Sequence, residues 1–223
     1  WRRTNDPYKI WISEVMLQQT TVNAVIPYFE KWIKTFPTIT DLAKTPVQTV
    51  LAQWQGLGYY NRAKNLHRSA QIIVNEHDAQ VPSDPEVVRR LPGFGPYTTG
   101  AVLSIAYNRK LPIIDANVRR VVMRILAIDG EADTKQDKHA LEFLLKVLPD
   151  QKVGDFNQAL MELGALICRS KEPVCVQCPV SKFCQAYKEG RQEIIPTPKK
   201  RTIKDIEAVI AIIENNGKFF IQK

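Results

Sequence analysis

The chain has 223 residues, of which 44% are hydrophobic and 24% charged, an ordinary globular composition. Aromatic and branched aliphatic residues recur throughout, which excludes intrinsic disorder, and no apolar run approaches the roughly 18 residues of a membrane span. Lys and Arg exceed Asp and Glu by 31 to 23, and the resulting charge of +8 favours a polyanionic partner. Because the chain begins at Trp1 without a signal peptide, we interpret it as a piece cut at both ends from a longer protein.

Apolar residues recur at steps of three and four over most of the chain, which predicts a mainly helical protein. Pro and Gly separate these stretches and predict short connections. The helices are expected at residues 10–21, 22–29, 47–54, 61–75, 85–91, 97–108, 116–128, 137–148 and 155–168.

The composition changes near residue 191. Residues 196–204 combine two prolines with four basic residues and predict an extended linker. The β-branched run 207–213 and residues 218–222 flank Asn215-Asn-Gly, a turn that predicts a β-hairpin. Since an isolated hairpin is marginal in water, residues 206–223 are expected to begin a second, truncated domain.

All four cysteines lie in one segment, with the spacing Cys168-x6-Cys175-x2-Cys178-x5-Cys184. This clustering argues against a disulfide scaffold and for one metal site in a reducing compartment. Four thiolates can hold either zinc or a cubane iron–sulfur cluster, and ligand count alone does not decide between them.

Residues 91–101 join two predicted helices through a Gly-x-Gly turn at Gly93 and Gly95. Glycines permit positive φ and close approach of a ligand to the backbone, and the free N–H groups of the second helix can bind a phosphate. Such a turn grips a duplex backbone without reading bases. The alternative is an ordinary helix–turn–helix corner.

Two carboxylates are candidates for chemistry. Glu14 lies within the apolar helix 10–21, where burial would favour a protonated acid, although most helical Glu side chains are solvated. Asp115 precedes the helix at 116 and is expected to cap it in its ionised form, which is also the ordinary role of such an Asp. A neutral acid paired with a fixed carboxylate suits cleavage of a glycosidic bond.

Several segments together resemble the helix–hairpin–helix DNA glycosylases, and within them the adenine DNA glycosylase (MutY) family. The resemblance covers residues 1–190 and extends weakly into 206–223. It is carried by the four cysteines and by residues 1–3 (WRR), 13–20 (SEVMLQQT), 56–63 (GLGYYNRA), 91–99 (LPGFGPYTT) and 113–118 (IIDANV).

The resemblance implies a mainly α fold, with a six-helix barrel over residues 25–130 and an iron–sulfur cluster domain formed by residues 1–24 and 131–190. A linker over 191–205 and the first hairpin of a Nudix-like C-terminal domain over 206–223 complete it. The implied cofactor is a [4Fe–4S] cluster held by Cys168, Cys175, Cys178 and Cys184.

The implied reaction removes adenine mispaired with 8-oxoguanine or guanine in duplex DNA. Glu14 matches the acid that protonates adenine, and Asp115 matches the carboxylate that stabilises the oxocarbenium, with Asn117 beside it. Tyr97 replaces the Schiff-base Lys of bifunctional relatives. Because Tyr cannot form an imine, strand scission should be weak or absent.

The remaining matched residues contact the flipped base or the duplex. Arg2 and Gln158 match positions that contact adenine, while Trp1 and Leu17 shape its pocket. Gln19 and Tyr59 match side chains that wedge into the gap left by the flipped base, the alternatives being a solvated helix residue and a core residue.

Two other functions compete with this one. A thymine-releasing mismatch glycosylase of the same superfamily can also carry Tyr at the Lys position. The Gln18-Gln19-Thr20 run and the β-hairpin expected within 206–223 favour adenine instead. A non-catalytic iron–sulfur module would bind DNA through the Gly-x-Gly turn of residues 91–101, and Glu14 would then have no role in chemistry. We expect a monomer without membrane association, in the cytoplasm and at the nucleoid of a prokaryote.

Overall fold

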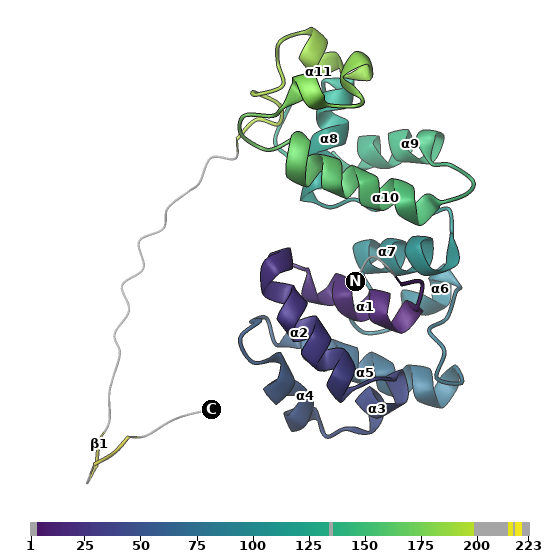
Figure 1. Ribbon diagram of the computed structural model, residues 1–223, viewed down its shortest axis with the longest axis vertical. Coiled ribbons are helices and arrows are strands. Elements are labelled where there is room, and N and C mark those ends of the chain that lie inside the picture. Colours follow the sequence, from purple (N-terminus) through teal and green to yellow (C-terminus); the bar gives the residue numbers. More distant parts are fainter. Residues whose placement is uncertain (1–3, 134–135, 199–213, 216, 220–223) are drawn as a thin grey trace.

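The computed structural model describes residues 4–133, 136–198, 214–215 and 217–219, and these residues are mainly helical (Figure 1). No helix in these ranges is long and apolar enough to cross a membrane. The α-helices are α1 (Pro7–Met16), α2 (Val22–Thr35), α3 (Ile39–Lys44), α4 (Val47–Trp54), α5 (Asn61–Glu76), α6 (Pro85–Val88), α7 (Pro96–Tyr107), α8 (Ala116–Leu126), α9 (Asp137–Val147), α10 (Val153–Glu162) and α11 (Gln185–Lys188).

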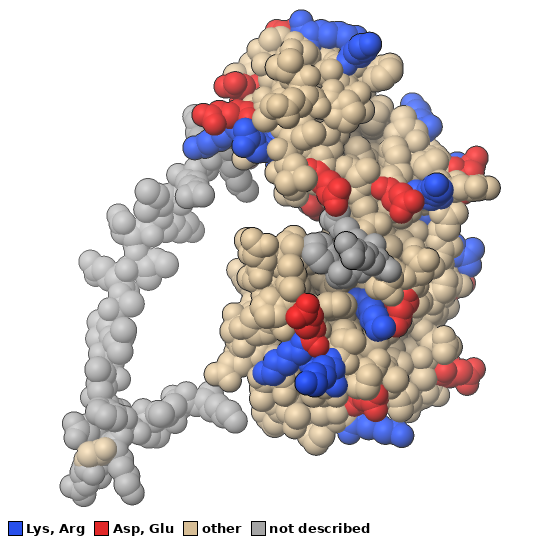
Figure 2. Space-filling view, viewed as in Figure 1, with Lys and Arg blue, Asp and Glu red and all other residues tan. Residues whose placement is uncertain are grey.

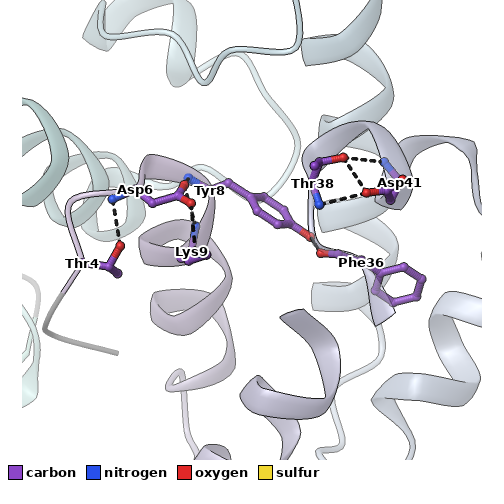
Figure 3. Close-up of polar contacts among 7 residues, drawn as sticks. All are labelled: Thr4, Asp6, Tyr8, Lys9, Phe36, Thr38 and Asp41. Carbon is purple, nitrogen blue, oxygen red and sulfur yellow. Dashed lines mark hydrogen bonds and ion pairs between the residues drawn. The ribbon is translucent and has the colours of Figure 1, made fainter. Parts of the chain in front are cut away.

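Helix α1 begins at a strong start signal. The Asp6 carboxylate accepts hydrogen bonds from the N–H groups of Tyr8 (2.9 Å) and Lys9 (3.4 Å), and proline occupies the first helical turn. The Tyr8 hydroxyl then reaches across to donate to the Phe36 carbonyl at 2.9 Å, just before α3 (Figure 3). The N-terminal end of α1 is therefore fixed both by its cap and by a contact to a distant segment.

The helices form two groups, with α7 between them (Figure 1). In the first group α1 contacts α2, α5 and α7 around a core that includes stacked Trp11 and Phe94 and the edge-on pair Trp32 and Trp54. In the second group α8 contacts α9, α10 and α11. Figure 2 shows the surface hollowed between the two groups.

The second group also contains a crossing of two helical segments that positions the candidate site. A π-helix, η1 (Leu163–Ile167), continues α10 and runs directly into the first cysteine, whose N–H donates to the Leu163 carbonyl at 2.7 Å. The η1 turn packs against α8 so closely that a Cβ at Gly164 would lie 2.6 Å from the Asn117 Cβ. π-helical turns are frequent at functional sites.

The observed elements correct several expected boundaries. The helix expected over 10–21 ends at Met16, because the chain turns there and Gln19 adopts a positive φ of 57°. Helix α3 has no counterpart among the expected stretches. Strands β1 (Glu214–Asn215) and β2 (Lys218–Phe219) pair antiparallel, which confirms hairpin pairing at the predicted turn, while the rest of 206–223 lies largely outside the described residues.

The contacts between helices also bear on how the chain divides into domains. The sequence grouped residues 1–24 with the cysteine segment, whereas α1 contacts α2 and α5 of the first group and α7 between the groups. Helix α8, expected within the barrel, contacts α9, α10 and α11. The expected domain boundaries stay a prediction.

Candidate active site and nucleic-acid interface

Glu14 is a buried carboxyl group on a buried helix. Its side chain lies on α1 between Ser13 and Val15, and the residue is only 4% exposed. The alternative interpretation of Glu14 as part of a solvated helix stripe is therefore wrong. Burial of a carboxyl is unfavourable unless hydrogen bonds or a charge partner compensate for it.

Tyr97 supplies a hydrogen bond to this carboxyl group. The Tyr97 hydroxyl donates to Glu14 Oε2 at 2.7 Å and lies 3.7 Å from the Met161 sulfur. Tyr97 is in the first turn of α7, whose start is set by Pro96, and Met161 is on α10. Through this one ring, Glu14 of the first helix group is connected to the core of the second.

Asp115 is held by two hydrogen bonds at the start of α8. Its Oδ1 accepts from the Val118 N–H at 2.7 Å, so it is the helix cap that the sequence predicted. Its Oδ2 accepts from Asn117 Nδ2 at 3.2 Å. The carboxylate therefore has a set orientation, with Asn117 directly beside it as the sequence motif suggested.

Two arginines on α8 that the sequence analysis missed extend this contact toward the cysteine segment. Arg120 donates to Asn117 Oδ1 (2.9 Å), to the Gly164 carbonyl (2.6 Å) and to the Cys168 carbonyl (2.9 Å). Arg124 is 1% exposed, and its Nη1 lies 3.3 Å from Cys168 Sγ. The spacing 117, 120, 124 places all three side chains on one helix face, a signal that could have been read from the sequence.

The four cysteines line a single cavity together with Arg124. Burial raises the pKa of the Cys175 thiol, and the charges of the neighbouring cysteines raise it further; burial also raises the pKa of Cys184. Among the described residues, no three His, Cys, Asp or Glu side chains are arranged to hold a single metal ion. The donor set is thus four sulfurs around one space, with a guanidinium at its edge.

The Gly-x-Gly turn before α7 has features expected of a turn that binds the phosphate backbone of a duplex. Gly93 has φ +81°, and a Cβ there would lie 3.0 Å from the Asn65 Cβ. Gly95 has φ −75°, so of the two glycines only Gly93 uses the positive φ that glycine permits. At Gly95 a Cβ would meet nothing within 4 Å, and no side chain caps the first N–H groups of α7.

Two exposed turns form a second surface. Gln19 follows α1 and Tyr59 precedes α5, and both are non-glycine residues with positive φ, 57° and 47°. Tyr59 is 65% exposed, so the alternative of a core residue is wrong; Gln19 is solvated, as its alternative held, but it lies in a turn after α1 ends at Met16 and not in a helix. They line one open cavity of about 360 Å³ with Gln18, Tyr60, Asn61 and Arg62.

The remaining candidate residues are distributed around these two surfaces. Gln18 Nε2 donates to the Thr98 hydroxyl at 3.1 Å, which joins the first turn to α7, and the Thr20 hydroxyl donates to the Gln18 carbonyl at 3.3 Å. Leu17 is half-buried against the first core. Gln158 hydrogen-bonds the Gly154 carbonyl of its own helix α10 at 3.2 Å. Trp1 and Arg2 lie outside the described residues.

A family model for HhH-GPD superfamily base excision DNA repair proteins matches residues 12–149, more than half of the chain. The chain belongs to this superfamily. The matched range contains Glu14, the Gly-x-Gly turn, Tyr97 and Asp115.

Known relatives of this superfamily member include adenine DNA glycosylases. The chain is 39% identical to that of Buchnera aphidicola subsp. Schizaphis graminum over 225 residues, which cover the whole chain and 65% of the relative. It is 42% identical to that of Rattus norvegicus over 194 residues, which cover 85% of the chain and 38% of the relative. The chain thus spans at most about two thirds of the length of these relatives.

The fold is similar to that of two solved structures. A thermostable thymine-DNA glycosylase superimposes with a TM-score of 0.74 at 32% identity, covering 85% of this chain and 88% of that one. A non-covalent endonuclease III–DNA complex superimposes with a TM-score of 0.71, covering 83% of this chain and 86% of that one. At 22% identity, the second likeness establishes the fold alone.

Proposed function

We propose that this protein is an adenine DNA glycosylase that removes adenine mispaired with 8-oxoguanine or guanine in duplex DNA. The observation that carries the proposal is the buried Glu14, held by the Tyr97 hydroxyl in a chain whose relatives are adenine DNA glycosylases. A base must leave the stack to reach a buried acid, which is the reason such enzymes flip their target.

The two carboxylates divide the chemistry. Glu14 donates a proton to adenine at N7, which makes the base a better leaving group; a carboxyl removed from water favours the protonated form this needs. Asp115, whose oxygens already accept from Val118 and Asn117, stays oriented as an anion and stabilises the oxocarbenium-like sugar. Water then completes the hydrolysis.

Tyr97 acts on the acid instead of on the sugar. Its hydroxyl is committed to Glu14, and a phenol cannot form an imine with C1′, so the enzyme is monofunctional, with weak or absent strand scission. Asn117 orients Asp115 and is in turn oriented by Arg120.

The duplex is bound through two surfaces. The turn at Gly93 and Gly95 presents uncapped N–H groups of α7 to a phosphate. Gln19 and Tyr59 fill the gap left by the flipped adenine. The residues around the adenine are Trp1, Arg2, Leu17 and Gln158, and Gln18 and Thr20 flank the wedge at Gln19.

We also propose that the four cysteines hold a [4Fe–4S] cluster. Their arrangement around one cavity supplies four sulfur donors to one group, and the [4Fe–4S] cluster is the group that the sequence resemblance implies. Bound there, the cluster would cross-link the cysteine segment, and the Arg124 guanidinium, 3.3 Å from Cys168 Sγ, would offset the negative charge of that thiolate. The domain division into a barrel over 25–130 and a cluster domain of 1–24 and 131–190 belongs to this proposal.

Identification of the released base tests the proposal. Duplexes containing an A:8-oxoguanine, an A:G or a T:G mispair are incubated with the intact protein under single-turnover conditions. Release of adenine from the first two is expected. Thymine release would instead support the thymine mismatch activity carried by the name of one structural relative, and duplex binding without any base release would support a non-catalytic module.

A further inference from the structure

The side chain of Arg62, at the start of α5, lies between the two turns that carry Gln19 and Tyr59. Its Nη1 donates to the carbonyls of Val15 (2.9 Å), Met16 (3.1 Å) and Gln18 (2.5 Å). Its Nη2 donates to the carbonyls of Leu57 (3.1 Å) and Gly58 (3.3 Å). One guanidinium thus bonds backbone on both sides of the 360 Å³ cavity that it helps to line.

Val15 and Met16 are the last two residues of α1 and Gln18 follows it, so Arg62 adds to the weak contacts that the Val15 and Gln18 carbonyls accept from the Gln18 N–H (3.4 Å) and the Thr20 hydroxyl (3.3 Å). Helix α1 ends at Met16, and the last carbonyls of a helix carry its negative dipole end. Arg62 therefore caps α1 from another helix, and it fixes the path of the chain directly before Gln19. It fixes the second turn in the same way, directly before Tyr59.

Both turns need such support because their conformations are unfavourable. A non-glycine residue at positive φ is strained, and Gln19 and Tyr59 both adopt it. The Arg62 guanidinium also lies 5.6 Å from the centre of the Tyr59 ring and 5.1 Å from that of Trp54. A point charge such as Lys could not make these planar, forked contacts.

We propose that Arg62 is a positioning residue for base flipping: it holds the two turns in register so that Gln19 and Tyr59 enter the duplex together when adenine leaves it. This inference rests on the proposed function, since it assigns Gln19 and Tyr59 to the gap in the duplex. Arg62 itself is committed to five backbone carbonyls and acts only through the two turns.

The test separates flipping from chemistry. The intact protein is added at saturation to a duplex with a non-cleavable 2′-fluoro adenosine opposite 8-oxoguanine and 2-aminopurine as its neighbour, whose fluorescence rises when the step unstacks. Arg62→Ala should abolish most of the rise seen with wild type, and Arg62→Lys should restore only part of it. Arg68→Ala removes an exposed arginine from the same helix and should match wild type.

A coupling experiment excludes a merely structural role. Arg62→Ala should lower the single-turnover release of adenine by about tenfold, a typical coupling for contacting residues. In a Gln19→Ala/Tyr59→Ala background, the same substitution should change the rate by less than about twofold, because nothing remains to be positioned. Equal losses in both backgrounds, or a wild-type fluorescence rise with Arg62→Ala, would overturn the inference.

The two proposals fail in different ways. If wild type unstacks the duplex but releases no adenine, the proposed reaction fails while the fluorescence comparison still tests Arg62. If wild type releases adenine and Arg62→Ala unstacks the duplex as wild type does, only the positioning role fails. Melting temperatures of all variants are measured alongside, and Arg62→Lys provides the comparison if Arg62→Ala does not fold.

Discussion

The crossing of η1 with α8 predicts that Gly164→Ala damages both stability and excision. A Cβ at this position would lie 2.6 Å from the Asn117 Cβ, closer than real Cβ contacts, and 3.0 Å from the Asn117 carbonyl oxygen, which is also unusually tight. Overpacking of this kind costs about 1–3 kcal/mol. The gain in helix propensity from Gly to Ala, at most about 1 kcal/mol, offsets only part of that.

The expected loss is therefore about 1–2 kcal/mol of unfolding free energy, which for a chain of this length lowers Tm by roughly 2–8 °C. The same displacement moves Asn117, whose amide donates to Asp115 Oδ2 at 3.2 Å. The rate of single-turnover adenine release should consequently fall by about tenfold or more, since displacing a catalytic group by even 1 Å lowers the rate strongly. Duplex affinity should be retained.

Gly154→Ala provides the matched control. A Cβ there would lie 2.6 Å from the Ile105 Cα, so the steric conflict is equal, but it falls on the contact between α10 and α7 instead of beside Asn117. It should lower Tm by a similar amount and affect excision less. Unchanged Tm and rate in Gly164→Ala, or an equal loss of rate in Gly154→Ala, would refute the reasoning.

Four further substitutions test other parts of the account. Arg124→Gln removes a buried guanidinium from Cys168 and from the backbone around it, and should reduce both the visible iron–sulfur absorbance of purified protein and its stability by roughly 3 kcal/mol; full absorbance and an unchanged Tm would contradict this. Gly95→Ala meets no neighbour and should weaken duplex binding in a titration with little change in Tm, whereas Gly93→Ala, at positive φ, should lower Tm. Asp6→Ala removes the cap of α1 and should lower the free energy of unfolding by about 1 kcal/mol, measured by denaturant unfolding, while the excision rate is retained. A clear fall in the excision rate would assign Asp6 another role.

Helices could be predicted from the sequence where apolar residues recur strongly at helical spacing and Pro or Gly bounds the stretch. Helices α4 and α5 fall within one residue of the expected stretches, because Pro46 and the Gly-rich turn before Asn61 bound them. The end of α1 was not readable. Leu17 to Thr20 continue the helical spacing, and the turn is set by hydrogen bonds from Arg62, more than 40 residues away.

The candidate site shows the same limit. Glu14 and Asp115 could be selected by their setting in an apolar helix and before a helix start, and the burial of Glu14 agrees with that selection. The contact of Tyr97 with Glu14 joins residues 83 positions apart, so no local pattern could predict it. Arg120 and Arg124 were overlooked because basic residues in a basic chain are usually solvated.

Single-turnover adenine release by Glu14→Gln is the measurement that tests the proton donor most directly. The amide keeps the shape of the buried side chain but cannot donate an acidic proton, so base release should be abolished while duplex affinity stays close to wild type. Glu30→Gln, the same change at an exposed position of α2, should release adenine at the wild-type rate. Wild-type excision by Glu14→Gln would contradict the account.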